Sequence, residues 1–196
     1  MSECDLSATY DMPDWAVKIT LAEQECVEYA KTILGDNNKV ALSVGTGASH
    51  LYSELYPQFQ SIDGITIIDE EINVAQLKER QYNIPYRILK NNKYDVGVIN
   101  AVLAPEYGLI VDVNLKMYGC CQHHWEEYFR YIVSKLASDG ILLSHSTGFG
   151  CYAGFRTGEL SLDELSSLLP YGFLLDTLPS PGRPEFCIIV IRRDHG

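Results

Sequence analysis

The chain has 196 residues, of which 46% are hydrophobic and 21% are charged. These proportions suit one globular domain with one sizeable core, and they exclude a disordered chain or a fibrous repeat. The formal net charge of -11 argues against a general nucleic-acid binder and against a protein that binds anionic membranes.

Several features bear on where the protein works. The N-terminal segment from Met1 to Asp5 is acidic and lacks the basic and apolar regions of a signal peptide. No apolar run approaches the ~18 residues that a membrane-spanning helix needs. The six cysteines are scattered along a chain that is large enough to fold without disulfides. We therefore expect a cytoplasmic protein with reduced thiols that makes no contact with a membrane.

Residues 1–19 show no clean periodicity, and we expect them to form an N-terminal arm or lid. A single domain is predicted over residues 20–196. Capping boxes open the helices that follow Thr20 and Ser161, because each residue precedes a glutamate by three positions. Helices are predicted at 20–34, 50–56, 72–80, 123–137 and 161–169. Strands are predicted at 39–45, 64–69, 85–90, 95–100, 141–144, 172–175 and 186–192.

This order of elements predicts an α/β fold. Strands that alternate with helices favour a doubly wound, mostly parallel sheet, here of seven strands, with helices on both faces. The last two strands flank a loop rich in proline and glycine, which predicts a C-terminal antiparallel hairpin at one edge. Residues 101–122 form the longest irregular stretch. We expect this loop to contribute to substrate specificity more than to the packing of the core.

A glycine loop follows the first predicted strand. Gly45 and Gly47 leave the backbone open to a ligand, and the helix that comes next offers unpaired N–H groups. Asp69 ends the second predicted strand, 22 residues (69 minus 47) beyond Gly47. A carboxylate at this spacing typically accepts the hydroxyls of a ribose. The pattern therefore predicts that the protein binds a nucleoside.

At this point the chain resembles a known family, the class I S-adenosylmethionine-dependent methyltransferases, which have a Rossmann-like fold. The likeness extends over about residues 20–193. Residues 40–47 (VALSVGTG) are similar to the family's first motif, and 67–70 (IIDE) to its second. Residues 94–103 (YDVGVINAVL) resemble its fourth-strand segment, and 136–143 (LASDGILL) the helix, turn and strand that come next.

The resemblance implies that S-adenosylmethionine is the cofactor. Gly45, Thr46 and Gly47 would cradle its methionine and ribose. Asp69 would hold the ribose hydroxyls, and Glu70 would flank the adenine.

The same resemblance gives roles to two further pairs of residues. Asn91 or Asn92 would meet the adenine edge, where many members of the family have an acid. Asn100 and Ala101 would line the side of the sulfonium.

Two positions depart from the family's usual pattern. Ser43 stands where an acid is common, and Ser49 stands where a third glycine is common. A protein that kept the fold and lost turnover is therefore one alternative to an enzyme.

Histidine is the natural general base near neutral pH. His145 directly follows the fifth predicted strand and is expected near the strand ends that form a pocket. His123 begins a predicted helix after the long irregular stretch. We take His145, and with less support His123, as candidate catalytic bases, although a polar residue that caps a strand is the ordinary alternative for His145.

The segment Cys120-Cys121-Gln122-His123-His124 contains four candidate metal ligands. Adjacent Cys-Cys and His-His pairs cannot easily place four ligands around one ion, and structural zinc sites use separated pairs. The sequence therefore predicts no metal site.

We expect methyl transfer from S-adenosylmethionine to an oxygen or nitrogen of a small-molecule acceptor. Transfer of the aminocarboxypropyl arm of the same cofactor and a non-catalytic binding protein remain as alternatives. The acidic composition, and the poor match of residues 100–105 to an Asn-Pro-Pro-Tyr segment, argue against a nucleic-acid acceptor. The sequence leaves the oligomeric state open, a homodimer included.

Overall fold

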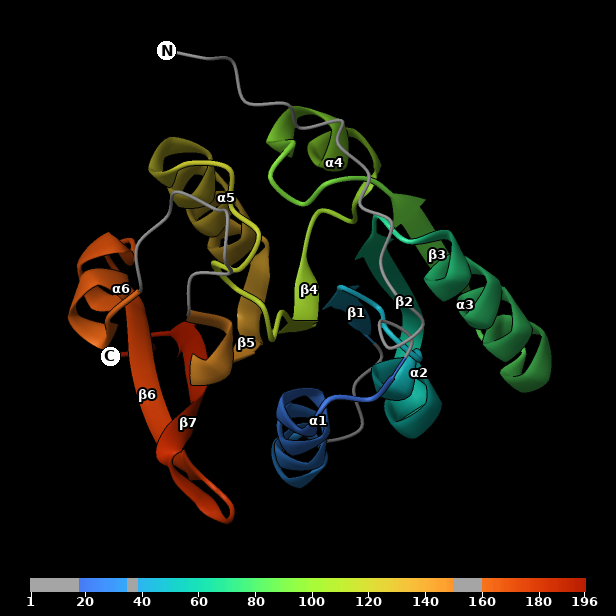
Figure 1. Cartoon of the computed structure of the whole chain (residues 1–196), viewed down its shortest axis with the longest axis horizontal. Helices are drawn as coiled ribbons and strands as arrows, with labels where there is room; N and C mark the ends of the chain where they lie inside the picture. Colours follow the sequence, from blue (N-terminus) through green and yellow to red (C-terminus); the bar gives the residue numbers. More distant parts are fainter. Residues whose placement is uncertain (1–17, 35–38, 150–159) are drawn as a thin grey trace.

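The computed structural model describes residues 18–34, 39–149 and 160–196 (Figure 1). The helices are α1 (Leu21–Ile33), α2 (His50–Leu55), α3 (Asp69–Tyr82), α4 (Val96–Val102), α5 (Gln122–Ser134) and α6 (Leu162–Leu168), with short 3-10 helices η2 (Tyr56–Gln58) and η3 (Ser146–Phe149). The strands are β1 (Lys39–Val44), β2 (Phe59–Thr66), β3 (Tyr86–Lys90), β4 (Tyr107–Val111), β5 (Leu136–His145), β6 (Phe173–Ser180) and β7 (Arg183–Arg193). Nearly all of the predicted N-terminal arm lies outside the described residues.

The seven strands form one sheet in the order β3-β2-β1-β4-β5-β7-β6. Strands β1 to β5 pair in parallel, and β7 lies antiparallel to both β5 and β6. This arrangement confirms the predicted doubly wound sheet with its C-terminal antiparallel hairpin. Among the helices of the described ranges, none is long and apolar enough to cross a bilayer.

Two hydrophobic clusters cover the two faces of the sheet, because successive side chains of a strand point to opposite faces. On β1, Ala41 packs into the cluster that includes α1, α2 and α3, whereas Leu42 packs into the cluster that includes α4, α5 and α6. Figure 1 shows α1 and α2 on one side of the sheet and α4 and α5 on the other. The helices therefore lie on both faces, as predicted.

Both predicted capping boxes are confirmed at their N-caps. The hydroxyl of Thr20 accepts a hydrogen bond from the backbone N–H of Glu23 at 3.1 Å, at the start of α1. Ser161 accepts from the N–H of Glu164 at 3.1 Å, at the start of α6. Each bond satisfies one of the N–H groups that the first turn of a helix leaves without a partner.

The predicted fourth strand is wrong, because residues 95–100 begin a helix. Asp95 is the N-cap of α4, and its carboxylate accepts from the N–H of Val98 at 3.2 Å. The fourth strand is instead β4, inside the stretch that was expected to be irregular. All five residues of β4 are buried between β1 and β5. The segment Asp112–Asn114 therefore occupies the carboxyl end of the fourth strand, the place that the resemblance gave to residues near Asn100.

Several boundaries also differ from prediction. Strand β2 begins at Phe59 and ends at Thr66, so that α3 already begins at Asp69. Strand β5 begins at Leu136, and the expected turn at Asp139 lies inside this strand. The register between β4 and β5 shifts at this end, which lets the extended strand follow its neighbour.

Candidate functional site

A cavity of about 370 Å³ opens at the carboxyl ends of β1, β2 and β4. The order of the sheet reverses here, because β2 lies on one side of β1 and β4 on the other. Ligands of open α/β sheets bind at such a switch point. The volume falls within the range of about 300–1,000 Å³ that is typical of small-molecule sites.

The glycine loop forms one wall of the cavity. Gly45 and Gly47 both line it, and both have left-handed backbone conformations, with φ of 72° and 49°. Glycine adopts such angles without steric cost. The N–H of Gly45 donates to the carbonyl of Ile65 at 2.8 Å, which ties the loop to β2. Ser49, where the third glycine is common, also has a positive φ of 55°.

Three carboxylates line the cavity, from Glu23 on α1, Glu71 on α3 and Asp112 after β4. All three residues are buried. Glu71 accepts a hydrogen bond from the hydroxyl of Thr46 at 2.9 Å. Thr46 is itself buried and lies outside the residues that line the cavity.

Glu23 is the least satisfied of these carboxylates. Its Oε1 atom is buried and makes no hydrogen bond with the part of the chain that the structure describes. Burial raises the pKa of Glu23 to about 8, and the neighbouring charge of Glu71 adds to the increase against opposing backbone hydrogen bonds. A donor on a ligand can satisfy this oxygen.

Asp112 belongs to a buried charged network. The Nζ atom of Lys93 lies 2.8 Å and 3.1 Å from its two oxygens, and also donates to the carbonyl of Asn114 at 2.6 Å. The hydroxyl of Tyr128 donates to Asp112 at 2.7 Å. Burial lowers the pKa of Lys93, and Asp112 opposes that shift. These bonds fix the loop after β4 against the cavity.

The sequence-predicted residues divide between the cavity and the surface. Gly45, Gly47 and Asn91 line the cavity. Asp69 and Glu70 do not, because the chain continues for two residues beyond β2 and turns Asp69 outward at the start of α3. Both oxygens of Asp69 accept from the Nζ atom of Lys90 at 2.7 Å, and this pair is exposed.

Asn100 and Ala101 are also placed outside the cavity. Both are exposed on α4, and neither lines the space at the ends of the strands. They were expected there because residues 95–100 were predicted as a strand. The residues that occupy the carboxyl end of β4 are Asp112, Val113 and Asn114, and all three line the cavity.

His145 does lie at the end of β5, but it is fully buried and outside the lining of the cavity. Its Nε2 atom is 3.0 Å from Oε2 of Glu25, and its Nδ1 atom is 2.8 Å from the hydroxyl of Thr147. Burial lowers the pKa of His145, and Glu25 opposes that shift. His123 is exposed near the start of α5 and does not line the cavity.

Sequence reasoning missed five charged residues of the cavity: Lys18, Glu23, Glu71, Lys93 and Asp112. Glu23 was seen only as part of a capping box. Asp112 had a usable signal, since it ends the uniformly apolar run of residues 107–111. Glu71 is the third of three consecutive acidic residues, and Lys93 lies in a polar turn after Asn91 and Asn92, so nothing in the sequence distinguishes either of them.

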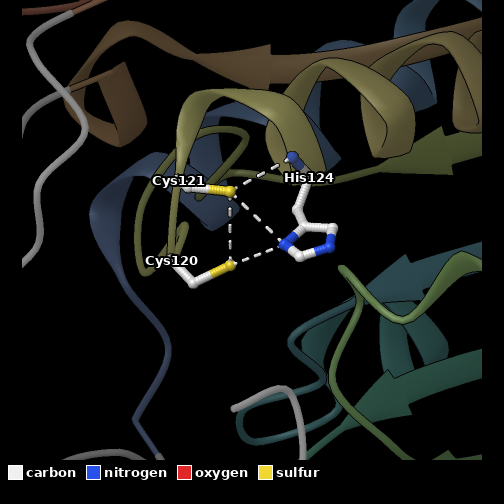
Figure 2. A group of neighbouring side chains, drawn as sticks. All are labelled: Cys120, Cys121 and His124. Carbon is white, nitrogen blue, oxygen red and sulfur yellow. Dashed lines mark hydrogen bonds between the residues drawn. The ribbon is translucent and has the colours of Figure 1, made fainter. Parts of the chain in front are cut away.

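A second group of side chains lies at the start of α5. Figure 2 shows Cys120, Cys121 and His124 pointing toward one another, with three potential ligand atoms in close proximity. Met117 and Tyr118, a few residues earlier, line the cavity.

Comparisons with known proteins establish the fold. No protein-family model and no curated protein matches the chain. An N-methyltransferase NodS from Bradyrhizobium japonicum, solved with S-adenosyl-L-homocysteine, is 16% identical with a TM-score of 0.65, over 95% of this chain and 94% of that one. An S-adenosylmethionine-dependent methyltransferase from Clostridium acetobutylicum is 12% identical with a TM-score of 0.63, over 94% and 93%.

A third similar structure is an rRNA methylase from Streptococcus thermophilus, 9% identical with a TM-score of 0.59, over 86% of this chain and 94% of that one. The chain therefore has the fold of the S-adenosylmethionine-dependent methyltransferases, as its resemblance implied. Because one of these neighbours acts on rRNA, the fold does not support the predicted exclusion of a nucleic-acid acceptor.

Proposed function

We propose that this protein is an S-adenosylmethionine-dependent methyltransferase that binds its cofactor in the cavity and methylates an oxygen or nitrogen of a small molecule. The observation that carries the proposal is the cavity itself, where a glycine loop and three buried carboxylates meet at the switch point of the sheet. A similar structure is a complex with S-adenosyl-L-homocysteine, which supports the same ligand here.

The residues of the cavity fit this cofactor. S-adenosylmethionine carries a sulfonium, an ammonium and two ribose hydroxyls, which favour carboxylate neighbours. Three carboxyl groups line the cavity, and one of them, that of Asp112, already pairs with Lys93. The unsatisfied Oε1 atom of Glu23 offers an acceptor to a ligand donor. Asn91 and Asn92 both line the cavity, and the amide of either suits the adenine edge, the role that the resemblance gives to one of them.

When bound, the cofactor supplies a methyl group on a positively charged sulfur. The protein then needs to orient the acceptor and to exclude water, and proximity alone can provide much of the rate. We assign the removal of the acceptor's proton to Glu23, because its carboxylate faces the cavity and its pKa of about 8 suits a general base. His145 and His123 remain as candidates from the sequence, but neither lines the cavity.

The choice of a small-molecule acceptor is supported by charge. A net charge of -11 repels a polyanion such as RNA. A screen for the acceptor should therefore test RNA beside small amines and hydroxyl compounds. Methylation of RNA alone would contradict the choice of a small molecule. Detection of S-adenosylhomocysteine as the product identifies methyl transfer, whereas methylthioadenosine identifies transfer of the aminocarboxypropyl arm.

Calorimetric titration with S-adenosylmethionine and with S-adenosylhomocysteine tests the proposal. We expect saturable binding of both ligands with dissociation constants on the order of micromolar. No heat and no thermal stabilisation at millimolar ligand would sink the proposal.

Carboxylate variants show which residue holds the ligand. We expect Glu71→Gln to weaken binding of S-adenosylmethionine by roughly tenfold or more, since a charge-assisted hydrogen bond is worth about 1.5–3 kcal/mol. Glu70→Gln is the matched control, because Glu70 is adjacent, exposed and outside the cavity. Asp69→Asn tests the assignment made from the sequence. If Asp69→Asn weakens binding and Glu71→Gln does not, Asp69 holds the ligand, as expected from the sequence, and Glu71 does not.

A further inference from the structure

The group at the start of α5 has the composition of a metal site. The Sγ atoms of Cys120 and Cys121 are 3.9 Å apart, and Nδ1 of His124 lies 3.1 Å from the first and 3.4 Å from the second (Figure 2). All three residues are partly buried. Two sulfurs and one imidazole nitrogen form a donor set that binds zinc and other thiophilic ions.

The separations also agree with coordination of one ion. In a tetrahedral zinc site with Zn–S bonds of about 2.3 Å and Zn–N bonds of about 2.0–2.1 Å, the ligand atoms lie about 3.5–3.8 Å apart. Each of the three observed separations is within about 0.5 Å of this range. An ion slightly out of the plane of the three atoms can therefore reach all of them with small side-chain shifts.

The local backbone holds the group in place. Cys121 is the N-cap of α5, and its sulfur accepts from the backbone N–H of His124 at 3.5 Å. The N-terminus of a helix stabilises nearby negative charge, so this position suits the sulfur of a metal-bound cysteine. His124 lies in the first turn of α5, which brings its ring over both sulfurs.

We propose that Cys120, Cys121 and His124 bind one zinc ion, as the three ligands that the described part of the chain supplies, and that water or another ligand takes the fourth position. The sequence predicted no metal because four ligands within five residues cannot surround one ion. The structure removes that objection, since only three of them converge and His123 is exposed. This inference does not depend on the proposed methyl transfer.

The position of the site suggests what the ion does. Five residues shortly before Cys120 line the cavity: Asp112, Val113, Asn114, Met117 and Tyr118. The hydroxyl of Tyr94 donates to the carbonyl of Met117 at 2.8 Å, so this loop is already attached to the wall of the cavity. An ion bound to Cys120, Cys121 and His124 attaches the end of the same loop to α5. It therefore stabilises one wall of the cavity from outside.

Metal binding is measured on the full chain without any other ligand. The protein is purified with a thiol reductant, stripped with a chelator and titrated with Zn²⁺ or Co²⁺ alone. We expect one ion per chain, and with Co²⁺ we expect thiolate charge-transfer absorption together with the visible bands of a tetrahedral complex. Zn²⁺ is also expected to raise the melting temperature.

Variants locate the ion. Cys120→Ser, Cys121→Ser and His124→Ala should each weaken Zn²⁺ binding by more than about 100-fold, since even changes next to the ligands cost about 10- to 100-fold. Cys121→Ser is informative because serine is a good N-cap, so the helix keeps its start while the sulfur is lost. Cys187→Ser and His123→Ala are matched controls that should bind as the unchanged protein does.

Three results would overturn the inference. The reduced protein binds no Zn²⁺, or it binds Zn²⁺ with undiminished affinity after Cys120 or Cys121 is replaced. A disulfide between Cys120 and Cys121 in the protein purified without reductant, found in an unreduced digest and unaffected by Zn²⁺, also contradicts it. Because no cofactor is present, none of these results bears on methyl transfer.

Discussion

Glu23 contributes both to the start of α1 and to the wall of the cavity. Its backbone N–H completes the cap of α1, while its carboxylate is buried against the cavity beside Glu71. A buried carboxylate resists ionisation, which is why its pKa is raised to about 8 from 4.5. The same property that suits a general base therefore reduces the stability of the folded protein near neutral pH.

The pH dependence of stability tests this conclusion. Because the folded pKa of Glu23 lies above the unfolded one, the folded protein keeps a proton that the unfolded chain releases above about pH 4.5. The free energy of unfolding should therefore fall as pH rises from about 4.5 to about 8, by up to about 1.4 kcal/mol for each pH unit. Glu23→Gln should remove this part of the slope in urea unfolding measured across that range.

A matched control is available on the same helix. Glu28 is exposed on α1, and Glu28→Gln should leave the slope unchanged. If Glu23→Gln and Glu28→Gln have the same pH dependence as the unchanged protein, Glu23 is not a buried acid with a raised pKa.

At the scale of the residue, the sequence predicted the glycine loop of the site better than the charged side chains that line the cavity. Gly45 and Gly47 could be identified because a strand, two glycines and a helix follow in order. Glu71 could not, because the choice between Asp69, Glu70 and Glu71 depends on where β2 ends. Strand β2 ends at Thr66, and two residues separate it from α3. As a result Asp69 lies at the surface, and Glu71 lines the cavity.

Helix starts are the elements that the sequence specifies most directly. The hydroxyl of Thr20 caps α1, and we expect Thr20→Ala to lower the free energy of unfolding by about 1 kcal/mol. Thr32→Ala is the control, because Thr32 is exposed in the last turn of the same helix. Chemical denaturation without ligand measures both. Equal effects of the two variants would show that the hydroxyl of Thr20 contributes nothing as a cap.

The exchange of a strand for a helix near residue 100 has a physical reason. Residues 95–100 contain valines and an isoleucine, which favour strands in isolation. Of the α4 residues only Ile99 is buried. The packing of Ile99 and the cap at Asp95 therefore stabilise a short helix on the surface instead of a strand. The true strand, residues 107–111, is a continuous apolar run, as expected for a central parallel strand buried on both faces. Propensity alone does not distinguish the two segments.

At the scale of the whole molecule, the stability of the sheet depends on its last strand, β7. Strand β7 lies between β5 and β6, so that removing it would separate β6 from the sheet and expose the edge of β5. We expect a chain that ends at residue 180 to lose cooperative thermal unfolding and to aggregate. A chain that ends at Asp194 keeps every strand and is the control. A cooperative transition in the shorter chain would show that the remaining strands fold without β7.

The order of the sheet also has a consequence for synthesis of the protein. Strands β1 to β5 leave the ribosome before β7, which is the antiparallel neighbour of β5. Strand β6 also emerges before β7, the strand with which it pairs. The insertion of β7 must then join β5 and β6 in one late step. Until that step, the edge of β5 is available to other nascent chains, and this interval is when we expect the protein to need a chaperone most.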